Sequence, residues 1–149
     1  MNPEIWGPPI WILFHTMIEK SKEENYPVLG REIFSFIYRI CGYLPCPSCS
    51  QHATDFLKKI PIQNLKTKDD LKNIIYVFHN SVNKRKEKQM FNFEKINQYK
   101  NVNLWNAYNQ FINIYKTRGN LKLLNESFQR QIIIKNFKTW LINNSKNFN

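Results

Sequence analysis

Apolar side chains recur at intervals of three and four residues along most of this chain, and this helical spacing restricts its fold more than any other feature. No segment shows the strict alternation of apolar and polar residues that is typical of a half-buried β-strand. The 149 residues, of which 42% are hydrophobic, are enough to bury a core without disulfide bonds. We therefore predict an all-α protein.

Helix start and stop signals divide the first two thirds of the chain into four expected helices. Pro8 and Pro9 suit the first turn of the first helix, and Thr67 and Asp70 resemble a capping box before the fourth. The expected helices cover about residues 8–20, 29–41, 46–60 and 71–86. Because their connections are short, we predict a four-helix bundle.

Beyond residue 94 the composition shifts to Asn, Lys and aromatic residues, and helical spacing predicts two more helices over 103–117 and about 126–143. This segment contributes +8 of the formal net charge of +11, because it holds nine Lys or Arg and only Glu126 as an acidic residue. We therefore divide the chain into a bundle, residues 1–94, and a basic helical extension, residues 95–149. We expect the extension to pack on the bundle or on a partner rather than to stack on bases.

Two of the three cysteines stand two residues apart in Cys46-Pro47-Ser48-Cys49. Pro47 suits the first turn of a helix, so Cys46 is expected at the N-cap and Cys49 inside the first turn. There the unpaired amides and the helix dipole favour a thiolate, which is the nucleophile of thiol–disulfide exchange. An odd number of unevenly spaced cysteines does not resemble the framework of a small secreted domain. The pair therefore favours redox chemistry.

Two other interpretations of the cysteines remain open at this point. Cys41, Cys46, Cys49 and His52 provide enough donors for a tetrahedral zinc site, although their spacing matches no common structural zinc motif. A zinc site would belong to an alternative function, a zinc-stabilised basic helical module that binds nucleic acid through residues 95–149. The other interpretation is a buried and inert pair of cysteines.

Two further segments place flat or hydrogen-bonding side chains at helical spacing. Trp11 and His15 share a face of the first helix, and His79 and Asn83 share a face of the fourth, with Tyr76 one turn earlier. A single helical His is usually a packed core residue. Together with the cysteine pair, however, these side chains would form a slot for a planar aromatic cofactor, with cations at the helix end for a pyrophosphate.

Three motifs in this order resemble the Erv/ALR family of FAD-linked sulfhydryl oxidases, and the stretches MNPEIWG and LPCPSCSQHAT are especially similar to the small members encoded by large cytoplasmic DNA viruses. The three motifs are W-x3-H at Trp11–His15, C-x2-C at Cys46–Cys49, and H-N-x-V-N at His79–Asn83 followed by Lys88. The resemblance covers about residues 4–93. It implies a bundle of four main helices and a short fifth that holds FAD at its mouth and usually forms a homodimer.

The resemblance also implies roles for particular residues. Cys49 would lie beside the flavin ring, and Cys46 would exchange with an incoming dithiol. Electrons would pass from the dithiol through the Cys46–Cys49 disulfide to FAD and then to dioxygen, giving hydrogen peroxide. The residues expected to contact the cofactor are Trp11, His15, Tyr76, His79, Asn83, Lys84 and Lys88. No metal is expected.

Some features depart from the family pattern or limit it. Many cellular members of the family have a second, shuttle cysteine pair on a flexible tail, but no cysteine follows Cys49 in this sequence. We therefore expect a protein dithiol to be oxidised directly. A small thioredoxin-like or CxxxC carrier protein is a candidate for this client. Lys86 stands where the family often has Leu, and Cys41 is expected to be a buried free thiol. Without a signal peptide or a membrane span, we expect the protein in the host cytoplasm at viral assembly sites, with packaging in the virion a further option.

Overall fold

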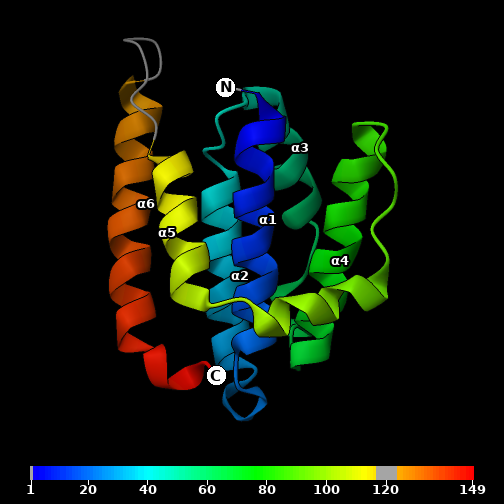
Figure 1. Cartoon of the computed structure of the whole chain (residues 1–149), viewed down its shortest axis with the longest axis vertical. Helices are drawn as coiled ribbons and strands as arrows, with labels where there is room; N and C mark the ends of the chain where they lie inside the picture. Colours follow the sequence, from blue (N-terminus) through cyan, green and yellow to red (C-terminus); the bar gives the residue numbers. More distant parts are fainter. Residues whose placement is uncertain (1, 117–123) are drawn as a thin grey trace.

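The computed structural model describes residues 2–116 and 124–149, which form six α-helices joined by short connections (Figure 1). The helices are α1 (Pro3–Lys20), α2 (Val28–Cys41), α3 (Pro47–Leu57), α4 (Lys68–Arg85), α5 (Leu104–Tyr115) and α6 (Leu124–Asn143), and a 3-10 helix, η3 (Phe93–Asn101), follows α4. No β-strand occurs in the two described ranges, so the all-α prediction is confirmed. In the same ranges no helix combines the length and the apolar character needed to cross a membrane.

The first helix begins earlier than the sequence predicts. Asn2 is its N-cap, accepting a hydrogen bond of 3.0 Å from the amide of Glu4, and Pro3 occupies the first turn. The prediction that Pro8 and Pro9 open this helix is therefore wrong, because both lie inside it. Each proline removes only a hydrogen bond to a carbonyl four residues earlier, which here lies at the exposed start of the helix.

The next three helices agree with the sequence prediction within three residues at each end. α2 starts one residue before the predicted Leu29, and α3 ends at Leu57 instead of Ile60. The capping box before α4 is confirmed: the amide of Asp70 donates to Thr67 Oγ1 at 3.1 Å, and the amide of Thr67 donates to Asp70 Oδ2 at 2.9 Å. Local sequence signals therefore set these helix boundaries.

A single hydrophobic core joins all six helices. Figure 1 shows α1 in the middle of the molecule, with α4 on one side, α5 and α6 on the other, and η3 crossing α1. The fully buried side chains of this core come from every helix and include Leu13, Met17, Ile33, Ile37, Leu57, Leu71, Ile75, Phe111 and Phe137. Thr117, the predicted end of α5, lies outside the described residues.

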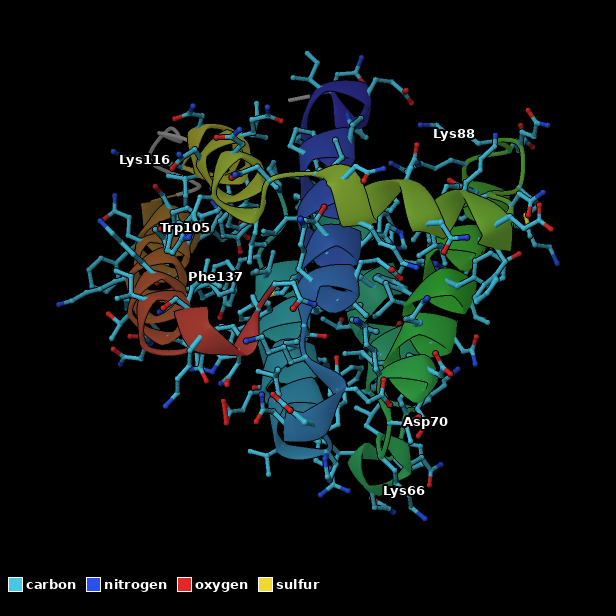
Figure 2. The ribbon with its side chains drawn as sticks, turned by 60° about the horizontal axis from the view of Figure 1, so that its bottom comes forward. Lys66, Asp70, Lys88, Trp105, Lys116 and Phe137 are labelled. Atoms are coloured by element: carbon cyan, nitrogen blue, oxygen red, sulfur yellow. A yellow bond between two sulfur atoms is a disulfide. The ribbon has the colours of Figure 1, made fainter. Side chains whose placement is uncertain are left out.

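Helices α5 and α6 pack against α1 and α2. The rings of Phe137 on α6 and Phe36 on α2 have centroids 5.2 Å apart, and Phe137 lies between the two helices in Figure 2. The buried hydroxyl of Tyr115 at the end of α5 donates to the carbonyl of Ile40 at 2.9 Å. A buried hydroxyl needs such a partner, so Tyr115 fixes α5 against the end of α2, close to the cysteine motif.

Candidate active site

The cysteine pair lies at the start of α3. Cys46 is the N-cap, and its sulfur accepts a hydrogen bond of 3.2 Å from the amide of Cys49, so the predicted cap is confirmed. A disulfide bond joins the two residues. Cys49 is buried, whereas Cys46 is partly exposed and its sulfur lies 3.3 Å from Ser48 Oγ. Only Cys46 is therefore readily open to attack from solvent.

A cation and a neutral imidazole flank the buried sulfur. Nη1 of Arg85, the last residue of α4, lies 3.9 Å from Cys49 Sγ. His52, one turn after Cys49, lies 3.2 Å from Ser81 Oγ through its Nε2 atom. Partial burial and the positive charge of Arg85 lower the pKa of His52, which is therefore neutral at pH 7. Arg85 is thus the positive charge that is placed to stabilise a thiolate at Cys49.

The third cysteine differs from this pair, although it lines the same cavity as Cys49. Cys41, the last residue of α2, is buried, and burial raises the pKa of its thiol far above the usual range. It is a free thiol, as expected. Among the described residues no group of three or more His, Cys, Asp or Glu side chains comes together as a metal site. The set Cys41, Cys46, Cys49 and His52 therefore gives no support to the zinc alternative.

Two adjoining cavities extend from the disulfide. The first, of about 40 Å³, lies between α1, α3 and α4, and its lining is apolar apart from Cys41, Cys49, His52, Arg85 and Lys86. The second is a groove of about 350 Å³ bounded by α1, the end of α4 and η3. Both are lined by Gly7, Trp11, Val82 and Lys86, so they form one slot that runs from Cys49 to the molecular surface.

Stacked aromatic rings form one wall of this slot. Trp11 lies flat on His79, with ring centroids 3.9 Å apart and planes 5° apart, and Phe91 covers the same imidazole at 4.8 Å. His15 Nε2 and His79 Nδ1 are 2.8 Å apart and share a hydrogen bond. Burial is the main cause that lowers the pKa of His15 to about 3 and that of His79 to about 4, and the charge of Lys88 lowers the pKa of His79 further. Both rings are therefore neutral at pH 7 and act as flat hydrogen-bonding surfaces.

Asn80, within the H-N-x-V-N motif, holds the chain that follows α4 over the slot. Its amide nitrogen donates to the carbonyl of Phe91 at 3.0 Å, and its Oδ1 accepts from the amide of Phe91 at 2.6 Å. Because one side chain satisfies both backbone groups, Phe91 is fixed against His79. Asn80 thus has a structural task that the sequence pattern alone did not reveal.

The end of α4 turns sharply and brings cations to the mouth of the slot. The amides of Glu87 and Lys88 bond to the carbonyls of Lys84 and Asn83 at 3.1 and 2.8 Å, the pattern of a Schellman motif. Glu87 has a φ of 57°, a left-handed conformation in which glycine is more usual. The turn directs Lys88 back to Glu4, with which it forms an ion pair of 2.7 Å.

The structure brings most, but not all, of the expected cofactor residues together. Trp11, His79, Asn83 and Lys88 line the groove, and His15 lies against His79. Two other expected residues line neither cavity. Tyr76 packs edge-on against Phe93, with ring centroids 5.1 Å apart, and Lys84 is exposed. Lys88, which does line the groove, lies at the end of α4 opposite Asp70 in Figure 2.

Several slot residues were missed by the sequence analysis. They are Trp6, Gly7, Arg85, Lys86, Phe91 and Tyr99. Lys86 was noted only as a departure from the family pattern, yet its ammonium group lies 5.4 Å from the ring centroid of Trp6. The available signals were the cluster of four cations at residues 84–88 and the stretch MNPEIWG, which contains Trp6 and Gly7. Phe91 and Tyr99 carry no signal, because their position depends on how the chain folds back over α1.

The lining of the slot suits the FAD that the family resemblance implies. A side chain at Gly7 would meet no atom within 4 Å, so the helical backbone there faces open space inside the slot. The surrounding wall is mostly aromatic and apolar, whereas Lys86, which lines both cavities, and Lys88, which lines only the outer groove, bring positive charge to it. A flat ring system that carries an anionic diphosphate has the matching shape and charge.

Comparison with known proteins agrees with this geometry. The model of the Erv1/Alr family matches residues 8–101, from α1 to the end of η3, so α5 and α6 follow the matched range. The FAD-linked sulfhydryl oxidase of African swine fever virus (isolate Pig/Kenya/KEN-50/1950) is 33% identical over 98 residues, which are 65% of this chain and 78% of that protein.

Two other viral relatives carry the same enzyme name provisionally. A protein of invertebrate iridescent virus 6 is 32% identical over 91 residues, which are 57% of this chain and 82% of that protein. A protein of vaccinia virus (strain Copenhagen) is 34% identical over 79 residues, with coverages of 52% and 76%. No solved structure matches the chain. The family match spans more than half of the sequence, and the chain belongs to the Erv1/Alr family.

Proposed function

We propose that this protein is an FAD-linked sulfhydryl oxidase that forms disulfide bonds in client proteins and reduces dioxygen to hydrogen peroxide. The observation that carries the proposal is the Cys46–Cys49 disulfide, whose buried sulfur opens onto the slot lined by Trp11 and His79. The names of the viral relatives support the same activity and the same cofactor.

The first step is thiol–disulfide exchange at the partly exposed sulfur. A client thiolate attacks Cys46 Sγ, a client–Cys46 disulfide forms, and the Cys46–Cys49 bond breaks with Cys49 leaving as a thiolate. The guanidinium of Arg85 at 3.9 Å and the amino end of α3 stabilise this negative charge. A second client thiolate then attacks the client sulfur of the mixed disulfide, which releases the oxidised client and Cys46.

The slot residues hold the cofactor. Cys49 would lie beside the flavin ring, Trp11 would pack on the cofactor, His79 and Asn83 would contact its adenosine part, and Lys88 would lie near the diphosphate. His15 keeps His79 in place through their shared hydrogen bond. The chemistry that FAD supplies when bound is acceptance of two electrons from the cysteine pair and their transfer to dioxygen. The apolar wall excludes water from the buried sulfur.

The family resemblance and the viral relatives support a wider setting for this activity. The substrate is a protein dithiol, for which a small thioredoxin-like or CxxxC carrier is a candidate, and the active form is a homodimer. Because the relatives are proteins of large DNA viruses, the site of action is the host cytoplasm during virus assembly. Disulfide bonds persist there only with a dedicated catalyst. Light scattering of the purified protein would test the dimer.

An anaerobic visible spectrum before and after addition of dithiothreitol tests the activity. We expect a flavin band that bleaches in the wild-type protein and in Cys41→Ala, because the buried Cys41 thiol has a raised pKa and is no nucleophile. Cys49→Ser should keep the band and lose the bleaching. A protein without a flavin band, or bleaching that survives in Cys49→Ser, would contradict the proposal.

A further inference from the structure

A second groove, separate from the cofactor slot, lies where α6 meets α2 and α3. Its volume is about 520 Å³, within the range of binding pockets in proteins. Residues from three helices line it, among them Tyr38, Arg39, Tyr43, Thr54, Ile132 and Ile133. Ile133 is buried, whereas Tyr38 and Ile132 remain 37% and 38% exposed. The groove therefore offers apolar surface to solvent.

The groove lies close to the sulfur that a client must attack. Tyr43 precedes Cys46 by three residues, so an extended chain separates them by at most about 10 Å. Thr54 lies eight residues after Cys46 along α3, a rise of about 12 Å. Pro47, Gln51 and Thr54 follow at helical spacing and are exposed or partly exposed, so one open face of α3 connects the disulfide with the groove.

A buried arginine of α6 fixes the groove to the cysteine loop. Arg130 is 2% exposed, and its Nη1 atom donates to the carbonyl of Tyr43 at 3.2 Å. Ser50 Oγ accepts from the next amide, that of Leu44, at 2.8 Å. The wall supplied by α6 and the loop that ends at Cys46 are therefore one connected unit. Because α6 follows the part matched by the family model, this groove is built with residues outside that match.

The charge of the groove points to the chemistry of its occupant. Arg39 lines it, and its described lining includes no acidic side chain. The carboxylate of Asp55, the residue after Thr54, forms an ion pair of 3.1 Å with Lys58. The 95–149 segment that supplies α6 adds a net charge of +8. An acidic segment would therefore be attracted and a basic one repelled.

We propose that this groove docks the client: an extended segment of the dithiol protein, bearing an apolar side chain and a carboxylate, lies in it while the client cysteine attacks Cys46. The proposal rests on the proposed oxidase function. The apolar side chain contacts Tyr38 and Ile132, and the carboxylate pairs with Arg39. Because Tyr43 and Thr54, the groove residues next to the cysteine motif, lie within about 10 to 12 Å of Cys46, these side chains lie at least about three or four residues from the attacking cysteine.

The test compares three reductants in oxygen-consumption assays of the full-length protein. Two are reduced synthetic peptides that contain the same Cys-x-x-Cys pair, with a Leu three residues before the first cysteine. They differ only at the position four residues before that cysteine, where one peptide has Glu and the other has Lys. The third is dithiothreitol, which is too small to use the groove. We expect kcat/KM for the Glu peptide to exceed that for the Lys peptide by about tenfold.

Substitutions in the groove should change the turnover of the peptides and leave the turnover of dithiothreitol unchanged. Ile132→Asp should lower kcat/KM for the Glu peptide by about tenfold, and Arg39→Glu should reverse the preference toward the Lys peptide. Turnover of dithiothreitol should be unchanged in both. Ile142→Asp is the matched control, since Ile142 is a 51% exposed residue of α6 that does not line the groove.

Three results would overturn the docking proposal. Equal turnover of the two peptides by the wild-type protein would show that the groove does not distinguish an acidic client segment from a basic one. An equal loss for dithiothreitol and peptides in Ile132→Asp would indicate a structural effect. Conversion of a dimer to a monomer by Ile132→Asp, seen by light scattering, would assign the groove to a second copy of the chain. Failure to oxidise even dithiothreitol would instead refute the oxidase function, and the docking role with it.

Discussion

Replacing Arg85 by Met should raise the pKa of the Cys49 thiol in the reduced protein by about one unit. The Nη1 atom lies 3.9 Å from Cys49 Sγ. At this distance a unit charge pair is worth about 1 kcal/mol in water and about 4 kcal/mol at an effective dielectric constant of about 20. Arg85 is an exposed residue, so the smaller value applies, and about 1.4 kcal/mol corresponds to one pKa unit.

The rate of alkylation by iodoacetamide as a function of pH measures this pKa. A Cys46→Ser background leaves Cys49 as the reactive thiol, because burial raises the pKa of Cys41. Arg85→Lys should restore most of the effect, and Lys84→Met is the control, since Lys84 is exposed and lines neither cavity of the slot. An unchanged pKa in Arg85→Met, or an equal rise in Lys84→Met, would refute a specific role for the guanidinium.

Three further outcomes are expected. Gly7→Leu should fill the slot, so the purified protein should lose its flavin absorbance while circular dichroism stays helical; retained FAD would contradict the assignment. Glu87→Gly should raise the free energy of unfolding in urea by about 1 kcal/mol, because glycine adopts the left-handed conformation without strain; no gain would count against this. Lowered pKa values at His15 and His79 mean that the unfolded chain binds more protons between about pH 4 and 6.5. Stability should therefore fall as the pH decreases through this range, by up to about 1.4 kcal/mol per pH unit for each histidine, and a flat profile in urea titrations would contradict it.

Local sequence signals predicted the helices best where the physical cause is itself local. The capping box at Thr67 and Asp70 and the apolar face of α2 depend on neighbours within a few residues, and both helices agree with prediction. The predicted start of α1 was wrong because proline in the first turn of a helix is a preference and not a requirement. Asn2 and Pro3 provide the start instead, and the helix tolerates Pro8 and Pro9.

The candidate site was predictable only in part for a related reason. Trp11 and His15 are four residues apart on one helix, as are His79 and Asn83 on another, so spacing alone predicts that each pair shares a face of its own helix. The positions of Arg85 against Cys49 and of Phe91 against His79 depend on the crossing of α3 with α4 and on the turn at Glu87. Contacts between distant segments of this kind leave no periodic trace in a single sequence.

The flat stacking of Trp11 on His79 gives the molecule a built-in optical reporter. Of the four tryptophans, Trp6 and Trp11 line the slot, whereas Trp105 and Trp140 belong to the α5 and α6 segments. A flavin absorbs light at wavelengths that tryptophan emits, so a loaded slot would quench the first pair most strongly. Fluorescence from Trp6 and Trp11 would therefore report cofactor loading, and fluorescence from Trp105 and Trp140 would report detachment of α5 and α6. Two double Trp→Phe variants, each keeping one of these pairs, would record the two events independently.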